Sequence, residues 1–96
     1  MIEIKLFLHV GDFAENKDKA KDIRLTQIIP ALDSNQEIAL NFEGIEATTQ
    51  SFVHALISDL IRKRGAEVLD KVYFKKCNKK VQEIINIVVD YAQEAE

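Results

Sequence analysis

The chain opens with apolar and other side chains in strict alternation, the apolar ones being Ile2, Ile4, Leu6, Leu8 and Val10. A period of two is typical of a strand with one buried face. The pattern therefore predicts a first strand from Ile2 to Val10, which the Gly11-Asp12 pair ends.

Apolar positions then recur at helical spacing between residues 20 and 32. Asn16 or Asp18 is suited to cap this first helix. Pro30 predicts a kink or a restart, because proline has no backbone N–H and disfavours helical angles at the residue before it. The Asp33-Ser34-Asn35 cluster predicts the end of the helix.

Three further elements follow. The short segment from Glu37 to Phe42 is apolar on both faces, which favours an inner strand covered by helices on both sides. Steps of three and four predict a second helix from the Thr48-Ser51 hydroxyls to near Gly65. A third strand is expected from Val68 to Phe74, and Asn78 is suited to cap a third helix.

This order of strands and helices predicts one small α/β domain over residues 1–96, βαβαβα, with a mixed or mostly parallel central sheet and amphipathic helices. A composition of 47% hydrophobic and 30% charged residues suits a single core with little room for a deep active site. Because we find neither an apolar run near the roughly 18 residues of a membrane helix nor a signal segment, we expect a cytoplasmic protein without membrane binding.

The net charge of −3 argues against a general nucleic-acid binder, but the charges are unevenly distributed. From Arg62 to Lys80 there are eight cations against two anions. Two interpretations stay open: a solvated face at the ends of neighbouring elements, or a docking patch for an acidic partner.

The sequence offers little catalytic chemistry. His9 and His54 are the available bases and neither has an obvious partner, so we expect His9 to be structural and His54 to face solvent or a partner. Cys77 stands just before a helix and near four lysines, which would lower its thiol pKa, so a reactive cysteine is an alternative. A single cysteine excludes an internal disulfide, and we expect no enzyme activity, cofactor or metal.

Three hydroxyls, those of Thr48, Thr49 and Ser51, gather where the second helix begins. Their ordinary role is helix capping. A regulatory role is the alternative, since a phosphoryl group at a helix N-terminus is favoured by the helix dipole.

The segments Ile38–Ile45 and Ala47–Leu56 resemble the strand-loop-helix of STAS domains, the sulfate-transporter and anti-sigma-factor-antagonist superfamily. Within it, the chain is most similar to the bacterial STAS-like domains of unknown function, over roughly residues 11–92. Further support comes from residues 13–18, Ile23-Arg24, Pro30 and residues 74–78. The resemblance implies a non-enzymatic regulatory module that docks a protein partner, with a histidine-kinase-like ATPase as the candidate.

In anti-sigma-factor antagonists the corresponding turn reads Asp-Ser-Ser-Gly, and its first serine is phosphorylated. Here Thr49, Gln50, Ser51 and Phe52 take those places, so glutamine stands at the phosphoacceptor position. The resemblance therefore implies a docking surface more than a modification site, although Thr49 or Ser51 could be modified. The expected partner face comprises the solvent-facing turn 46–51, including Thr48, and the helix positions at steps of four, which are His54, Ser58 and Arg62.

Two alternatives remain. The domain could be a ligand sensor that binds a nucleotide or another anion at the N-terminus of the second helix, near Arg62 and the lysines. It could also self-associate, because an exposed edge strand such as the first one can pair across a homodimer.

Overall fold

All strand pairs in the computed structural model, which describes residues 1–94, are parallel. The main sheet has the order β1-β3-β5, formed by Ile2–Lys5, Ile38–Asn41 and Val72–Lys75. A second sheet pairs β2 (Phe13–Ala14) with β4 (Ala47–Thr48). The predicted α/β class, the mostly parallel sheet and the central place of β3 are confirmed, whereas the second sheet was not predicted.

Each strand of the main sheet leads into a helical run. The first run comprises α2 (Lys17–Ile23), η1 (Arg24–Ile28) and α3 (Ile29–Asp33). The second run comprises α4 (Gln50–Val53), η2 (His54–Ser58) and α5 (Asp59–Arg64), and the third is α6 (Lys79–Glu94). Both η1 and η2 are π turns, in which N–H groups bond five residues back instead of four.

The predicted helix ends agree well with the structure. The side chains of Asn16, Thr49 and Asn78 each accept a hydrogen bond from a backbone N–H of the first turn that follows them. Pro30 lies in the first turn of α3, directly after η1, which confirms the expected restart of the first helix.

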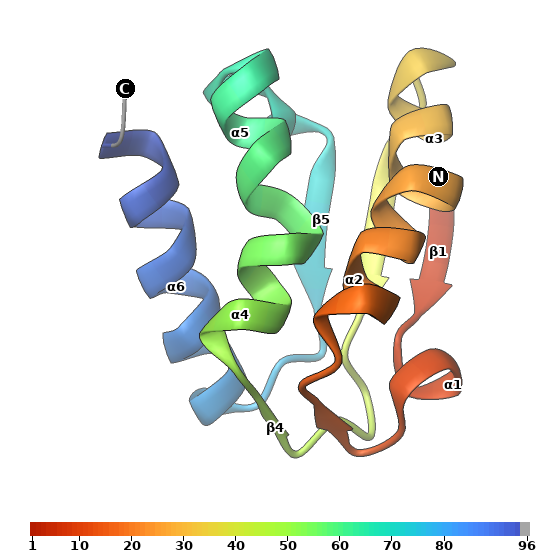
Figure 1. The fold of residues 1–96 in the computed structure, drawn as a ribbon. Helices are drawn as coiled ribbons and strands as arrows, with labels where there is room; N and C mark the ends of the chain where they lie inside the picture. Colours follow the sequence, from red (N-terminus) through yellow and green to blue (C-terminus); the bar gives the residue numbers. More distant parts are fainter. Residues whose placement is uncertain (95–96) are drawn as a thin grey trace.

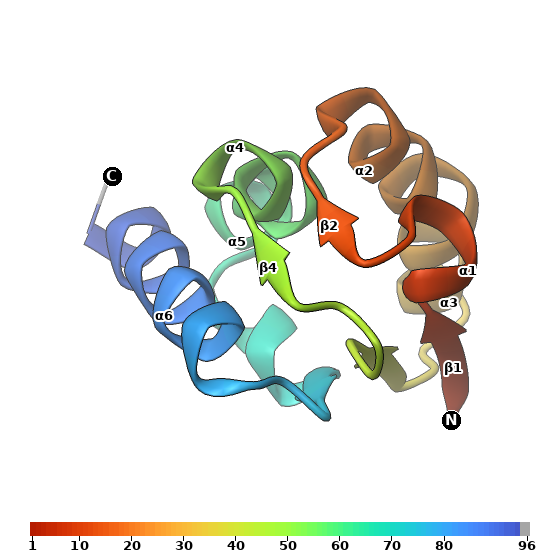
Figure 2. The same ribbon diagram turned by 90° about the horizontal axis from the view of Figure 1, so that it is seen from below.

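The helices cover one face of the main sheet only (Figures 1 and 2). Within residues 1–94, no helix lies over the opposite face, so the expectation of helices on both sides of β3 was wrong. Ala39 and Asn41 are nevertheless buried on that face. Neighbouring strands shield them: Ala39 lies between Glu3 and Tyr73 in register, and Asn41 Nδ2 donates to Glu3 Oε2 at 3.2 Å.

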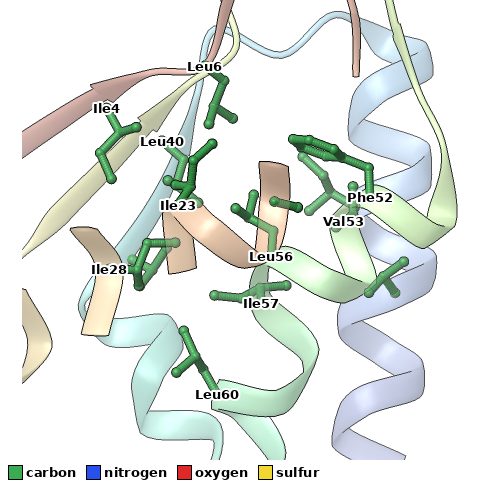
Figure 3. Close-up of a cluster of buried hydrophobic side chains, with 14 of the residues drawn as sticks. Ile4, Leu6, Ile23, Ile28, Leu40, Phe52, Val53, Leu56, Ile57 and Leu60 are labelled. Atoms are coloured by element: carbon green, nitrogen blue, oxygen red, sulfur yellow. The ribbon is translucent and has the colours of Figure 1, made fainter. Parts of the chain in front are cut away.

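The core lies between the covered face of the sheet and the helices. Figure 3 shows Ile4, Leu6 and Leu40 from the sheet region opposite the buried side chains of the first and second helical runs. The alternating apolar positions of the strands and the helical repeats therefore meet in one cluster.

The first strand is shorter than predicted. Leu6 N–H donates to the carbonyl of Asn41, the last residue of β3, at 3.0 Å. Beyond that point the strand has no partner, and Phe7–Val10 form a helical turn, α1, in which Leu8 is 77% exposed. The predicted extension to Val10 was wrong because β3 offers no further backbone partners beyond Asn41, and the chain satisfies its own backbone groups by forming a helical turn.

The third strand also begins later than predicted. Ala66–Asp70 form a 3-10 turn, η3. Its apolar residue Val68 is buried, and in the sequence such a residue looks the same as one in a strand. The strand β5 itself begins at Val72.

Gly44 packs directly against an aromatic ring, which leads to a prediction. Its φ is +89°, and an added Cβ would lie 2.9 Å from Cδ2 of Phe7. Gly11 also has a positive φ, +73°, but an added Cβ there would meet nothing within 4 Å. We expect urea unfolding to show a loss of about 1 kcal/mol for Gly11→Ala and about 2 to 3 kcal/mol for Gly44→Ala. Equal losses would contradict the contact with Phe7.

Candidate functional site

A groove of about 460 Å³ lies between the start of the second helical run and α6. Gln50, Ser51 and His54 line it from α4 and η2, and Ile87 and Tyr91 line it from α6. Lys17, the first residue of α2, also lines the groove. In Figure 1 the two walls are the α4 end of the green helix and the neighbouring blue helix.

The second sheet positions one wall of this groove. Thr49 N–H donates to the Ala14 carbonyl at 3.0 Å, and Thr48 Oγ1 donates to the same oxygen at 2.9 Å. Thr49 has extended backbone angles, and its Oγ1 accepts from Phe52 N–H at 3.1 Å. The turn before α4 is therefore attached to β2, and the helix begins immediately after it.

Within the predicted turn 46–51, the four residues from Thr48 to Ser51 differ in accessibility. Thr48 is only 9% exposed, so the expectation that it faces solvent was wrong. Its hydroxyl serves the internal bond to Ala14. Thr49 is half-buried and acts as the cap, whereas Gln50 and Ser51 are exposed. Among these four residues, Gln50 and Ser51 are thus the accessible ones.

The predicted helix face at steps of four is not formed. His54 and Arg62 are exposed, but Ser58 is 1% exposed. The segment between His54 and Ser58 is a π turn, which takes in more residues per turn than an α-helix. Four residues therefore fall short of a full turn, and the prediction that Ser58 faces a partner was wrong.

The buried Ser58 hydroxyl has no hydrogen-bond partner. A buried hydroxyl without a partner loses its bonds to water and gains nothing in exchange. We expect Ser58→Ala to raise the free energy of unfolding by about 1 kcal/mol, measured by urea denaturation. Ser51→Ala, at an exposed position, is the control and should change it by less than about 0.5 kcal/mol. A destabilised Ser58→Ala variant would show that the hydroxyl is satisfied.

Arg62 is separated from the groove. It lies twelve residues after Gln50, about 18 Å along a helix, so it cannot contribute to an anion site at the N-terminus of α4. The cationic run is also divided, because Arg62–Arg64 and Lys71 lie at the amino end of β5, and Lys75–Lys80 at its carboxyl end (Figure 1). The expected anion site beside Arg62, and a single cationic patch, are therefore wrong.

Several of these cations have local partners. Arg64 pairs with Asp33 at 2.7 Å, Lys71 Nζ donates to Asn35 Oδ1 at 2.8 Å, and Lys76 lies 3.8 Å from a carboxylate oxygen of Glu43. These contacts suit the interpretation as solvated ends of neighbouring elements.

Phe52 occupies the place that the resemblance assigns to a glycine. Its side chain is fully buried and points into the core beside Val53 (Figure 3). The aromatic ring therefore does not obstruct the outer surface of the turn; it anchors α4 to the core.

Cys77 is not activated. Burial raises its thiol pKa from about 9 to about 11. The expected lowering by nearby lysines was wrong because desolvation disfavours the thiolate, and the four lysines Lys75, Lys76, Lys79 and Lys80 are exposed to solvent.

This pKa yields a prediction. At pH 8 the folded protein holds far less thiolate than an unfolded chain, so iodoacetamide should alkylate Cys77 at least about tenfold more slowly in buffer than in denaturant. The rate should rise as the pH approaches 11. A peptide spanning residues 72–80 is the control for intrinsic reactivity. Equal rates in the folded protein and the peptide would contradict the raised pKa.

The histidines take no part in a cluster. His54 is exposed, as expected, and His9 is exposed on α1 and therefore not a core residue. Within residues 1–94, no three side chains of the types that bind metals come together. None of the helices in this described range has the length and apolar character needed to cross a membrane.

A family model described as "STAS-like domain of unknown function (DUF4325)" matches residues 19–82. The comparisons with curated proteins and with solved structures give no match. The matched segment includes Gln50, Ser51 and His54, whereas Ile87 and Tyr91 lie beyond it.

Proposed function

The chain belongs to the family of STAS-like domains of unknown function, and from this premise we propose that it is a non-enzymatic regulatory module that binds a protein partner. The binding site is the groove between the start of the second helical run and α6. The resemblance to anti-sigma-factor antagonists supports a histidine-kinase-like ATPase as the partner.

The observation that carries this proposal is that the groove unites Gln50, Ser51 and His54 with exposed apolar residues of α6. Tyr91 is 62% exposed, and Ile87 is also exposed beside it. Tyrosine and large aliphatic side chains are costly to expose and are frequent in the centres of protein interfaces.

The polar residues of the groove supply specificity. Gln50 and Ser51 offer both donors and acceptors at the exposed start of α4, and Lys17 adds a positive charge. A partner surface with an apolar side chain next to an acidic or amide group would match both walls.

Site-specific photo-crosslinking tests this proposal. A benzoylphenylalanine placed at His54 or Tyr91 should capture one protein in the native cells, identified by mass spectrometry as a histidine-kinase-like ATPase. Lys63, exposed at the far end of α5, is the control position and should capture far less. Equal capture at Lys63 would contradict the groove as the site.

A double substitution gives the complementary measurement. Gln50→Asp with His54→Ala should reduce co-purification of that ATPase at least tenfold, because it removes a donor and adds a charge within the groove. Circular dichroism should be unchanged, since both side chains are exposed. Undiminished co-purification would count against the proposal.

A further inference from the structure

The outer edge of β1 is unpaired in the monomer. The sheet order makes β1 an edge strand. Ile2 and Leu6 donate their N–H groups toward the β3 side, to Glu37 and Asn41 carbonyls at 2.9 and 3.0 Å. Since backbone groups alternate in direction along a strand, the N–H and C=O groups of Glu3 and Lys5 point away from β3. This edge can accept one more strand.

We propose that this edge pairs with the same edge of a second copy, giving a two-fold dimer with a continuous six-stranded sheet. Two identical edges related by a two-fold axis pair antiparallel. This inference concerns a surface separate from the groove and does not depend on the proposed partner.

The charges of β1 select one register. If the axis passes Ile4, Glu3 of each copy lies opposite Lys5 of the other, which makes two opposite-charge pairs at hydrogen-bonded positions. Centring the axis on Glu3 or on Lys5 would instead place like charges opposite each other. Because Ile4 points into the core, Glu3 and Lys5 point to the opposite face of the sheet, over which no helix of residues 1–94 lies (Figure 2), and both are exposed. The edge is therefore self-complementary in one register and repulsive in its neighbours.

Exposed apolar side chains lie just beyond both ends of the strand. Met1 is 70% exposed and Phe7 is 44% exposed. With the axis at Ile4, the residue before β1 of one copy comes near the α1 turn that follows β1 of the other copy and begins at Phe7. Apolar contact between these segments would add to the backbone hydrogen bonds at each end of the interface.

The dimer would leave both grooves accessible. In Figure 1 β1 lies at one side of the molecule and α6 at the opposite side. Pairing at β1 therefore places the two grooves at the far ends of the assembly. Such a dimer presents two binding sites to a partner that is itself dimeric.

Sedimentation equilibrium of the full chain, together with charge variants, tests the proposal. The interface is small, so we expect a monomer–dimer equilibrium with a dissociation constant on the order of 10 to 100 µM. Glu3→Lys and Lys5→Glu each create two like-charge pairs and should each weaken the dimer at least tenfold.

Mixing provides the matched control. In a one-to-one mixture, each Lys of the Glu3→Lys chain meets a Glu of the Lys5→Glu chain, so a heterodimer should form at the strength of the original protein. The chain that carries both substitutions should dimerise with itself again. Circular dichroism checks that each variant is folded.

Three results would overturn the proposal. They are a monomer at every concentration, a dimer insensitive to both single substitutions, and a mixture no more associated than its components. If the protein is a monomer at every concentration, the free edge of β1 would instead be available to a strand from another protein.

Discussion

Replacing Phe52 with alanine is expected to lower the free energy of unfolding by about 3 to 5 kcal/mol. The ring is fully buried and packs in the cluster formed by the sheet and the helices (Figure 3). Its loss leaves a cavity under the first turn of α4, which Thr49 caps. The α4 wall of the groove should therefore become more mobile as well. Urea denaturation measures the first effect, and amide hydrogen exchange in α4 measures the second.

Phe13→Ala is the matched control for Phe52→Ala. The two substitutions remove the same ring, but Phe13 is exposed on β2, and we expect a loss below about 1 kcal/mol. A loss of less than about 1.5 kcal/mol for Phe52→Ala would contradict its role as the anchor of α4.

Arg24→Met is expected to lower the free energy of unfolding by about 2 kcal/mol. The side chain of Arg24 is only 12% exposed, and its Nη1 donates to the Ala55 carbonyl at 2.8 Å and to Asp59 Oδ2 at 3.3 Å. The first bond joins η1 to η2, the π turn that places His54 in the groove, and the second joins η1 to the start of α5. Methionine retains much of the apolar packing but leaves the carbonyl and the carboxylate without their donor. Thermal and urea unfolding measure the loss.

Arg64→Met is the control that shows whether burial or a short ion-pair distance causes the loss of stability in Arg24→Met. The Arg64–Asp33 pair is shorter, at 2.7 Å, but its side chains are 36% and 59% exposed. Exposed ion pairs are screened by water, so this control should cost less than about 1 kcal/mol. If Arg64→Met cost as much as Arg24→Met, the junction between the π turns would have no special importance.

The two-residue strands β2 and β4 help to determine which residues line the groove. They hold the turn before α4 beside the start of α2, which is why Lys17 lies at the same groove as Gln50 and Ser51. The groove is thus assembled from three segments that are distant in the sequence, and only one of them includes the predicted partner face.

The sequence by itself determined the order of the three main-sheet strands and the three helical runs, the central strand and the helix caps. Those features depend on local periodicity, on side chains such as Asn16, Thr49 and Asn78, and on the missing N–H of Pro30, all of which are readable along the chain. It also predicted that Gln50, Ser51 and His54 are accessible.

The tertiary structure alone decided the rest, because it depends on partners that are far away in the chain. The β1 strand ends at Lys5 because its pairing with β3 ends at Asn41. Desolvation raised the pKa of Cys77. Ser58 is buried in η2, the π turn that contacts η1. Thr48 is buried because its strand, β4, pairs with β2. A π turn and a two-residue ladder leave no periodic pattern in a sequence, so the shape of the groove emerges only when the helices pack.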